Sequence, residues 1–267
     1  MKDAGYNRGL AVTRDGSLFA VSNGRTHMIT VYSTVDGSET VSFGSWGNGP
    51  GQFDRPQKLC ITPRDTLLVA EYGRWNQRVQ EVTMAGVHIR YIGEGVFGEG
   101  IWGIACNDEH VAVTKYGYTT LNRVLLFNYA TGCLVNQFAG FGSGGGHIAH
   151  SSGVRFTPDN QHIIVVDTFN NKRLSMFTVD GVWVKHIGVG VLGGGWSDVD
   201  FTADGRIIVA DYWNHRVCIF AADGVMISSW GSRGSSDGQF EYPTALAISG
   251  DKLLVLDANS ARAQVFD

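Results

Sequence analysis

Short apolar runs separated by polar turns recur along the whole chain. One stretch holds four of them in succession, at residues 197–202 (SDVDFT), 206–211 (RIIVAD), 216–220 (RVCIF) and 225–230 (VMISSW). The segments between the runs are ADG, YWNH and AADG, and Gly and Asp suit turns that need unusual backbone angles. The runs have the length of strands, and no helical period longer than one turn interrupts them. The pattern therefore predicts a unit of four short strands.

This unit repeats six times along the sequence. The residue that follows the central loop recurs at intervals of 50, 45, 50, 43 and 46, at positions Met28, Arg78, Arg123, Arg173, Arg216 and Arg262. Four-stranded units repeated six times predict an all-β fold, a six-bladed β-propeller that forms one domain over residues 1–267. A solenoid of the same units is the less favoured alternative. The expected blades are roughly residues 1–47, 48–94, 95–144, 145–190, 191–236 and 237–267.

The last unit is expected to be incomplete. It offers strands at TALAIS (244–249), KLLVLD (252–257) and AQVF (263–266), and the sequence stops at Asp267. Residues 1–6, MKDAGY, are too short and polar to supply a good fourth strand. We therefore expect three full strands in this blade, with an outer edge that either a longer natural chain or a partner chain would cover. Adding residues that complete the blade is expected to raise the melting temperature.

The segment DYWNHRVCIF at residues 211–220 resembles the NHL repeat, which is named for Asn-His-Leu at this position. The segments RPQKLCITPRDTLLVAE and PTALAISGDKLLVLDA resemble the first two strands of that repeat. The departures are Thr26-His27-Met28 in the first unit and the longer loop YGYTTLN in the third. The resemblance implies a propeller, and such domains often lie at the C-terminus of larger proteins, including ubiquitin ligases that also bind RNA. It does not imply one activity, because propellers host many.

Comparing the six units separates structural positions from variable ones. At the position of His215 the units carry His27, Gln77, Asn122, Lys172, His215 and Ala261, so this position predicts a surface loop rather than a metal ligand or a catalytic histidine. The next residue is Arg in five units. In four of these units an acid ends the second strand, which predicts ion pairs between Glu71 and Arg78, Asp167 and Arg173, Asp211 and Arg216, and Asp257 and Arg262. Lys115 stands in place of the acid in the third unit, so Arg123 needs another partner there.

Composition and charge exclude some classes of protein. The formal net charge of −4 gives no overall attraction to double-stranded DNA or to an anionic membrane, and no apolar run approaches the length of a membrane helix. The cysteines, Cys60, Cys106, Cys133 and Cys218, are far apart in sequence, lie in apolar runs and form no CxxC motif. We expect four isolated buried thiols, a cytoplasmic location and no cofactor.

Aromatic and basic residues gather in the segments expected at one end of the ring. In a propeller, the loops between the second and third strands share this end with the connections between blades. We expect a ligand-binding face here, with its aromatic side chains at least partly exposed. Its candidate residues are Arg25, Arg55, Lys58, Tyr72, Arg74, Trp75, Tyr116, Tyr118, Phe169, Lys172, Tyr212 and Trp213.

Aromatic rings with cations between them suit several kinds of ligand. A protein or peptide with anchoring side chains is our first expectation, and single-stranded RNA is the second. An enzyme of the amidating-lyase or lactonase type with a metal in the channel is a third reading. The only locally paired histidines are His147 and His150, in a Gly-rich loop, and we treat them as weak metal candidates. No P-loop, Gly-x-Ser-x-Gly or HExxH motif is present.

Overall fold

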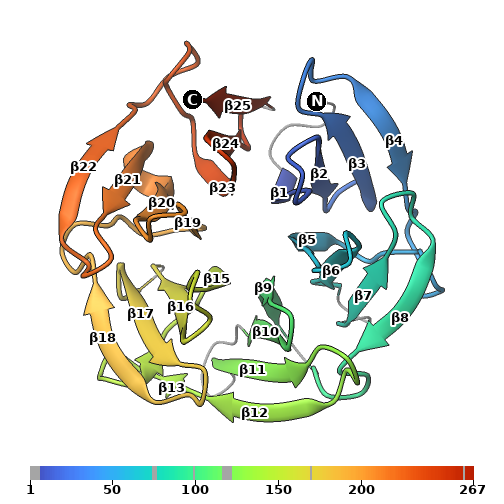
Figure 1. Ribbon diagram of the computed structural model, residues 1–267, viewed down its shortest axis with the longest axis horizontal. Coiled ribbons are helices and arrows are strands. Elements are labelled where there is room, and N and C mark those ends of the chain that lie inside the picture. The colour runs from blue at the N-terminus through green and yellow to red at the C-terminus, as the bar shows by residue number, and fades with distance from the viewer. Residues whose placement is uncertain (1–6, 74–76, 99, 116–121, 169, 261) are drawn as a thin grey trace.

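The protein is a ring of six antiparallel sheets around a central channel, as the sequence predicted (Figure 1). The computed structural model describes residues 7–73, 77–98, 100–115, 122–168, 170–260 and 262–267. In the complete blades the four strands pair in chain order, from an inner strand at the channel to an outer strand at the circumference. In the described part of the last blade three strands pair, which also agrees with the prediction.

The strands are short, with four to seven residues in most, and tight turns join them. Those of the first three blades are β1 (Asn7–Val12), β2 (Leu18–Asn23), β3 (Met28–Ser33), β4 (Glu39–Phe43), β5 (Pro56–Ile61), β6 (Leu67–Glu71), β7 (Val79–Val82), β8 (His88–Ile92), β9 (Ile101–Cys106), β10 (His110–Lys115), β11 (Arg123–Asn128) and β12 (Leu134–Phe138). Those of the other three blades are β15 (Gly153–Phe156), β16 (His162–Asp167), β17 (Arg173–Thr178), β18 (Trp183–Ile187), β19 (Asp198–Phe201), β20 (Ile207–Asp211), β21 (Arg216–Phe220), β22 (Met226–Trp230), β23 (Pro243–Ser249), β24 (Lys252–Asp257) and β25 (Arg262–Phe266).

The inner strands β1, β5, β9, β15, β19 and β23 pack side by side around the channel, and β23 meets β1 to close the ring. Neighbouring inner strands lie very close together at two glycines, each the third residue of its strand. A Cβ atom on Gly9 would lie 2.3 Å from the carbonyl oxygen of Gln57, and one on Gly103 would lie 3.1 Å from the Cα atom of Gly153. These positions therefore need glycine so that neighbouring inner strands can approach. Two small elements lie in the loops, the parallel pair β13 (Gly140–Phe141) and β14 (His147–Ile148) and the 3₁₀ turn η1 (Tyr212–Asn214).

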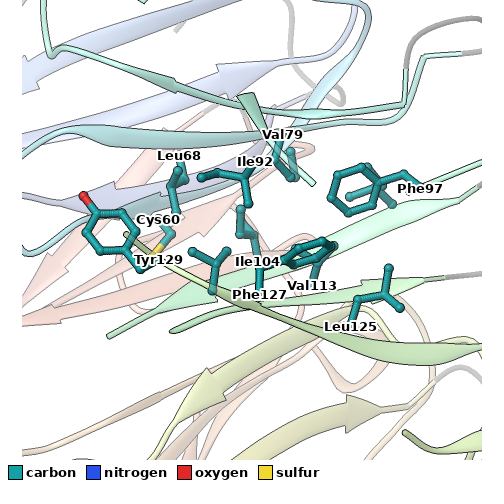
Figure 2. Packing of buried hydrophobic residues seen from close by; sticks show 13 residues of the cluster. Cys60, Leu68, Val79, Ile92, Phe97, Ile104, Val113, Leu125, Phe127 and Tyr129 are labelled. Carbon is teal, nitrogen blue, oxygen red and sulfur yellow. The ribbon is translucent and has the colours of Figure 1, made fainter. Parts of the chain in front are cut away.

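The hydrophobic core lies between neighbouring blades rather than in one central mass. Side chains from the second and third blades form one such layer, shown in Figure 2. Phe97 and Phe127 are its largest fully buried members, with ring centroids 5.2 Å apart. Because each blade is covered on both sides, the middle strands are mostly apolar and buried, as in Leu67–Glu71, where all five residues are buried and only the last is charged.

The four ion pairs predicted from the repeats are present. The Nε atom of the arginine lies 2.8 Å from the carboxylate in Glu71–Arg78, 3.1 Å in Asp167–Arg173, 2.9 Å in Asp211–Arg216 and 3.6 Å in Asp257–Arg262. The side chain of each acid is fully buried, whereas 8–26% of each arginine side chain is exposed. The acid ends the second strand of a blade and the arginine begins the third, so each pair closes the loop between them.

Each pair also fastens the connection that arrives from the preceding blade. The other oxygen of the carboxylate accepts a backbone N–H from that connection, donated by Asp54, Ala149, Gly193 or Glu241 at 2.7–2.8 Å. The guanidinium donates to carbonyl oxygens of the same connection, such as those of Ser143 and His147 in the case of Arg173. A planar guanidinium can satisfy several acceptors at once, which explains why Arg recurs here and Lys does not.

The two blades without an acid use asparagine instead. In the first blade Asn23 Oδ1 accepts the backbone N–H groups of Arg25 and Thr26, and Asn23 Nδ2 donates to Asn7. In the third blade Asn122 Oδ1 accepts the N–H of His150, at 2.8 Å. Arg123, which the sequence left in need of another partner, has an exposed side chain.

The residue before the arginine varies between blades, but its backbone conformation is shared by three of them. His27, Lys172 and His215 have φ angles of 59°, 51° and 53°, in the left-handed region. Residues other than glycine adopt this region only singly, so what these units share is the turn and not one side-chain chemistry. The prediction that His215 belongs to a loop is therefore supported by its geometry.

Replacing Phe127 with Ala is expected to lower the free energy of unfolding by about 3–5 kcal/mol, because the cavity left between two rigid sheets cannot collapse fully. Urea denaturation would measure this loss. Phe141→Ala is the matched control, since 45% of that side chain is exposed, and it should change the free energy of unfolding by much less. Equal losses in the two variants would contradict the inter-blade core described here.

Replacing Arg173 with Met should cost about 3–5 kcal/mol, because the buried carboxylate of Asp167 loses its counter-charge. Burial already raises the pKa of Asp167 above its ordinary value, although hydrogen bonds from Ala149 and Asn171 and the charge of Arg173 oppose the rise. A raised folded pKa means that stability falls as pH increases through that range, so the penalty in Arg173→Met should be smaller at acidic pH than at neutral pH. Arg206→Met is the control, because its pair with Asp204 is exposed and solvent screening leaves it little effect on stability. A pH-independent loss, or equal losses in both variants, would contradict a structural role for the buried pair.

Candidate ligand-binding face

One end of the ring, which we call the loop face, carries the loops between the second and third strands together with the connections between blades. A row of aromatic rings crosses it. Tyr72 contacts Trp102 with ring centroids 4.9 Å apart, Trp102 stacks on Trp196 at 6.1 Å, and Trp196 meets Tyr212 at 5.5 Å. Tyr212 then contacts Tyr242 at 4.8 Å. The rings come from four different blades, so folding the ring is what brings them together.

The ends of the inner strands supply the central members of this row. Trp102 is the second residue of β9, and Trp196 and Tyr242 stand just before β19 and β23. Arg8, the second residue of β1, places its guanidinium 4.0 Å from the centroid of the Trp196 ring. A guanidinium at this distance over an indole face makes a favourable cation–π contact.

A cavity of about 670 Å³ opens beside this row. Among the described residues that line it, three are arginines and none is acidic; the lining is Arg8, Gly24, Arg25, His27, Arg55, Gln57, Tyr72 and Trp102. Arg25 and Arg55 have exposed side chains, whereas Tyr72 and Trp102 are partly buried. The cavity therefore combines positive charge with aromatic surface, which suits a ligand that carries both negative charge and apolar or planar groups.

Several residues predicted from the sequence do reach the loop face. Arg25 and Arg55 line the cavity beside Tyr72, and Lys172 lies exposed on its loop. Trp213, with 53% of its surface exposed, contacts Tyr242 at 5.7 Å between ring centroids. The predicted residues Arg74, Trp75, Tyr116, Tyr118 and Phe169 lie outside the described residues.

Two of the residues predicted for the ligand-binding face, Tyr212 and Lys58, are buried. Tyr212 was expected to be exposed, but only 8% of it is, because Trp196, Trp213 and Tyr242 surround its ring. Burial raises the pKa of its hydroxyl. Tyr212 therefore supports the neighbouring rings rather than offering a contact surface.

Lys58 was also expected on this face, but it lies inside the channel with 6% of its surface exposed. Its Nζ atom donates to Asp198 at 2.8 Å and to the backbone oxygen of Thr244 at 2.9 Å. Burial lowers the pKa of Lys58, and the negative charge of Asp198 opposes that shift. Because Lys58 belongs to the second blade and Asp198 to the fifth, this ion pair crosses the channel.

The sequence reasoning missed Arg8, Trp102, Trp196 and Tyr242. All four lie in or just before inner strands. For the three aromatic residues, an isolated ring in such a segment indicates core packing in a sequence. Aligning the inner strands would have given one usable signal. Arg8, Gln57 and Trp102 precede the equivalent apolar residues Leu10, Leu59 and Ile104 by two positions, and such positions converge at the mouth of the channel.

The histidines considered as metal ligands have separate surroundings. His147 is exposed on β14, and its ring contacts the backbone oxygen of Gly145, whereas His150 lies 6.0 Å from the ring of Phe141. Burial lowers the pKa of His150 and of His215. Within the part of the chain that the structure describes, no three His, Cys, Asp or Glu side chains gather in a way that could hold a metal ion. A search of the same residues finds no helix with the length and apolar character needed to cross a membrane.

The expectation of four isolated buried thiols is wrong. Cys133 is exposed, and Cys60 and Cys106 have their sulfur atoms 2.9 Å apart. These two cysteines are separated by 46 residues, but they lie on neighbouring inner strands, β5 and β9. Only Cys218 is fully buried without another thiol beside it among the described residues, and burial together with the charge of Asp211 raises its pKa to about 12.

Solved structures of similar shape share little sequence with the chain. Hydrazine synthase from Kuenenia stuttgartiensis superimposes with a TM-score of 0.69 at 14% identity, over 99% of this chain and 96% of that one. A protein of unknown function from Bacteroides caccae gives 0.65 at 12% identity, over 90% and 82% of the two chains. A chain of a nidogen/laminin complex gives 0.66 at 13% identity, over 84% and 79%. At these identities the likeness shows the fold alone.

No curated protein matches the sequence. Residues 197–220, which cover the first three strands of the fifth blade, match the family model of the NHL repeat. The matched segment contains the Asp211–Arg216 pair that fastens the loop in this blade, and related pairs recur in the second, fourth and sixth blades. The chain is thus a six-bladed β-propeller with an NHL repeat in its fifth blade, and the two findings together support an NHL-repeat propeller.

Proposed function

We propose that the protein is a binding module that recognises a protein partner through an acidic peptide segment with aromatic or apolar side chains, held on the loop face. The observation that carries the proposal is the cavity of about 670 Å³ between Arg8, Arg25, Arg55 and the rings of Tyr72 and Trp102. Arginine and large aromatic residues are the types that dominate binding energy at protein interfaces. Acidic groups would meet the arginines, and apolar groups would cover the rings.

The rigidity of the site favours this use. Trp102 stacks on Trp196 and meets Tyr72 edge to face, and the guanidinium of Arg8 lies over the ring of Trp196. Side chains that are already held in place lose little conformational freedom when a ligand arrives. One of the structures with the same fold is a chain from a complex of two proteins, nidogen and laminin, so a propeller of this shape is compatible with partner binding.

Single-stranded RNA is the second candidate, and the observation in its favour is the row of rings with Arg8 on Trp196. Bases can stack on exposed aromatic faces while arginines contact phosphates. The same residues would bind either ligand, so the location of the site does not distinguish the two proposals. They differ in how strongly the binding affinity depends on salt concentration. Binding of RNA releases counterions in proportion to the phosphates contacted, which makes it strongly dependent on salt.

Replacing Trp102 with Ala should weaken binding of a peptide selected from a random display library on the full chain by about 10–100-fold, because a central aromatic anchor is lost. Isothermal titration calorimetry with the synthesised peptide would measure the change. The matched control is Trp183→Ala, since Trp183 lies on the outer strand β18 with 40% of its surface exposed, and this variant should bind normally. Circular dichroism should show that both variants are folded. A selected peptide that binds Trp102→Ala as tightly as the parent would contradict the proposed site.

Measuring affinity against salt concentration should separate the two ligand classes. If the three arginines of the cavity each contact one phosphate, the logarithm of the affinity for an oligouridylate should fall with a slope of about −2 against the logarithm of the salt concentration. The selected peptide should show a shallower dependence. The double variant Arg25→Glu, Arg55→Glu should lose affinity for either ligand. Tight oligouridylate binding with the steep slope, and no peptide recovered from the library, would overturn the first proposal in favour of the second.

A further inference from the structure

The channel has a second cavity at the end opposite the loop face, where the turns between first and second strands lie. This cavity measures about 480 Å³. Its walls include the turn residues Thr13, Thr62 and Thr157 and the buried arginine Arg155. It also includes both Cys60 and Cys106, which the loop face does not use.

The two cysteines form a close pair across a junction between blades. Cys60 comes from β5 of the second blade, and Cys106 from β9 of the third. Their sulfur atoms lie 2.9 Å apart, and both thiols lie near the backbone oxygen of Ile61, at 3.4 Å from Cys60 and 3.1 Å from Cys106. Figure 2 shows the Cys60 side chain among the buried side chains of this inter-blade core. Cys106 is partly exposed, so the pair can be reached from the cavity.

The surroundings make Cys60 the more acidic of the two thiols. The hydrogen bond from Cys106 lowers the pKa of Cys60, and the nearby positive charge of Arg155 acts in the same direction, against the effect of burial. The pKa of Cys106 is raised because it shares that proton with Cys60 and is itself buried. A thiolate that receives a hydrogen bond from a second thiol is the arrangement in which one cysteine is oxidised and the other resolves it.

We propose that Cys60 and Cys106 are a peroxide-responsive dithiol, which converts reversibly into a disulfide that links the second and third blades. The cavity is large enough to admit hydrogen peroxide, which is the oxidant in this proposal. Neither Cys133 nor Cys218 has a sulfur neighbour of this kind among the described residues. The reaction therefore selects one pair out of the four cysteines of the chain.

The chemistry balances with one peroxide molecule. The Cys60 thiolate attacks one oxygen of hydrogen peroxide, the O–O bond breaks, and the leaving hydroxide takes a proton to become water, which leaves a sulfenic acid on Cys60. The Cys106 sulfur then attacks the Cys60 sulfur, forming the S–S bond as the S–O bond breaks. The Cys106 proton leaves with the departing hydroxide as a second water. Two thiols and one peroxide thus become one disulfide and two waters, and a dithiol reductant reverses the change.

The consequence is a covalent link between two blades that otherwise meet through side-chain packing and hydrogen bonds, such as those from Arg90 to the backbone oxygens of Tyr129 and Ala130. The inner strands β5 and β9 are neighbours in the ring, and the core between their blades contains Cys60. A cross-link between positions 60 and 106 closes a long loop, and such cross-links stabilise a fold by restricting its unfolded chain. The oxidised protein should therefore melt at a temperature several degrees higher than the reduced protein.

The experiment exposes the full chain to a small excess of hydrogen peroxide, quenches it, and alkylates the remaining thiols with N-ethylmaleimide under denaturing conditions. Intact mass spectrometry should show the number of alkylated cysteines fall from four to two, and peptide mapping should find a cross-link between the peptides of Cys60 and Cys106. Dithiothreitol should restore four. Differential scanning calorimetry of the oxidised and reduced forms should show the higher melting temperature of the oxidised form.

Cys133→Ser is the matched control, because it removes an exposed thiol and leaves the pair intact; its alkylated cysteines should fall from three to one. Cys106→Ser should give no cross-link and should trap a sulfenic acid on Cys60, detected with dimedone. If Cys60 and Cys106 both remain alkylated at peroxide concentrations that oxidise Cys133, or if the cross-link involves Cys133, the proposal is overturned. A cross-link between Cys60 and Cys106 without a higher melting temperature would overturn the claim that it fastens the two blades.

Discussion

The loop face depends on a buried contact, present in four of the six blades, between an acid at the end of the second strand and an arginine beside the start of the third. The carboxylate of Asp211 accepts the N–H of Gly193, and Arg216 donates to the carbonyl oxygen of Val191, so both partners hold the connection from the preceding blade. That connection leads directly to Trp196 and to β19. The position of an aromatic ring at the mouth of the channel therefore follows from an ion pair several residues away, and a loose connection would leave the ring without support.

The channel is constrained in a different way, because six inner strands must share a narrow space. Glycine at positions 9 and 103 lets strands approach each other, and Lys58 and Asp198 cross the channel between opposite blades. Below them Arg155 lies 3.6 Å from Asp200. A buried charge without its partner would be costly, so these pairs hold each other in place. They also separate the aromatic cavity at one end from the thiol pair at the other, which allows the two ends to serve different purposes.

The sequence predicted the ring and the four ion pairs because they are repeated, and it predicted the three-stranded last blade because that unit could be compared with the complete ones. It did not predict the centre of the loop face. Trp102 and Trp196 occur once each in apolar runs, where they resemble core residues, and Lys58 resembles a surface cation because its partner Asp198 is 140 residues away. The contact between Cys60 and Cys106 was missed for the same reason, since closing the ring brings together strands whose sequence separation gives no local signal.

Repetition therefore identifies the scaffold, and departure from repetition identifies the places where function can reside. Equivalent positions of the inner strands lie at one level around the channel. A residue that differs between blades at such a level therefore makes the lining of the channel asymmetric. Arg8, Gln57 and Trp102 occupy one such level at the loop face, and they give three neighbouring blades different chemistry at the same height. A ring of identical blades would offer a ligand the same contact in every direction. This one offers charge on one side and aromatic surface on the next, and under the proposed function that asymmetry would fix the orientation of a bound acidic, apolar segment.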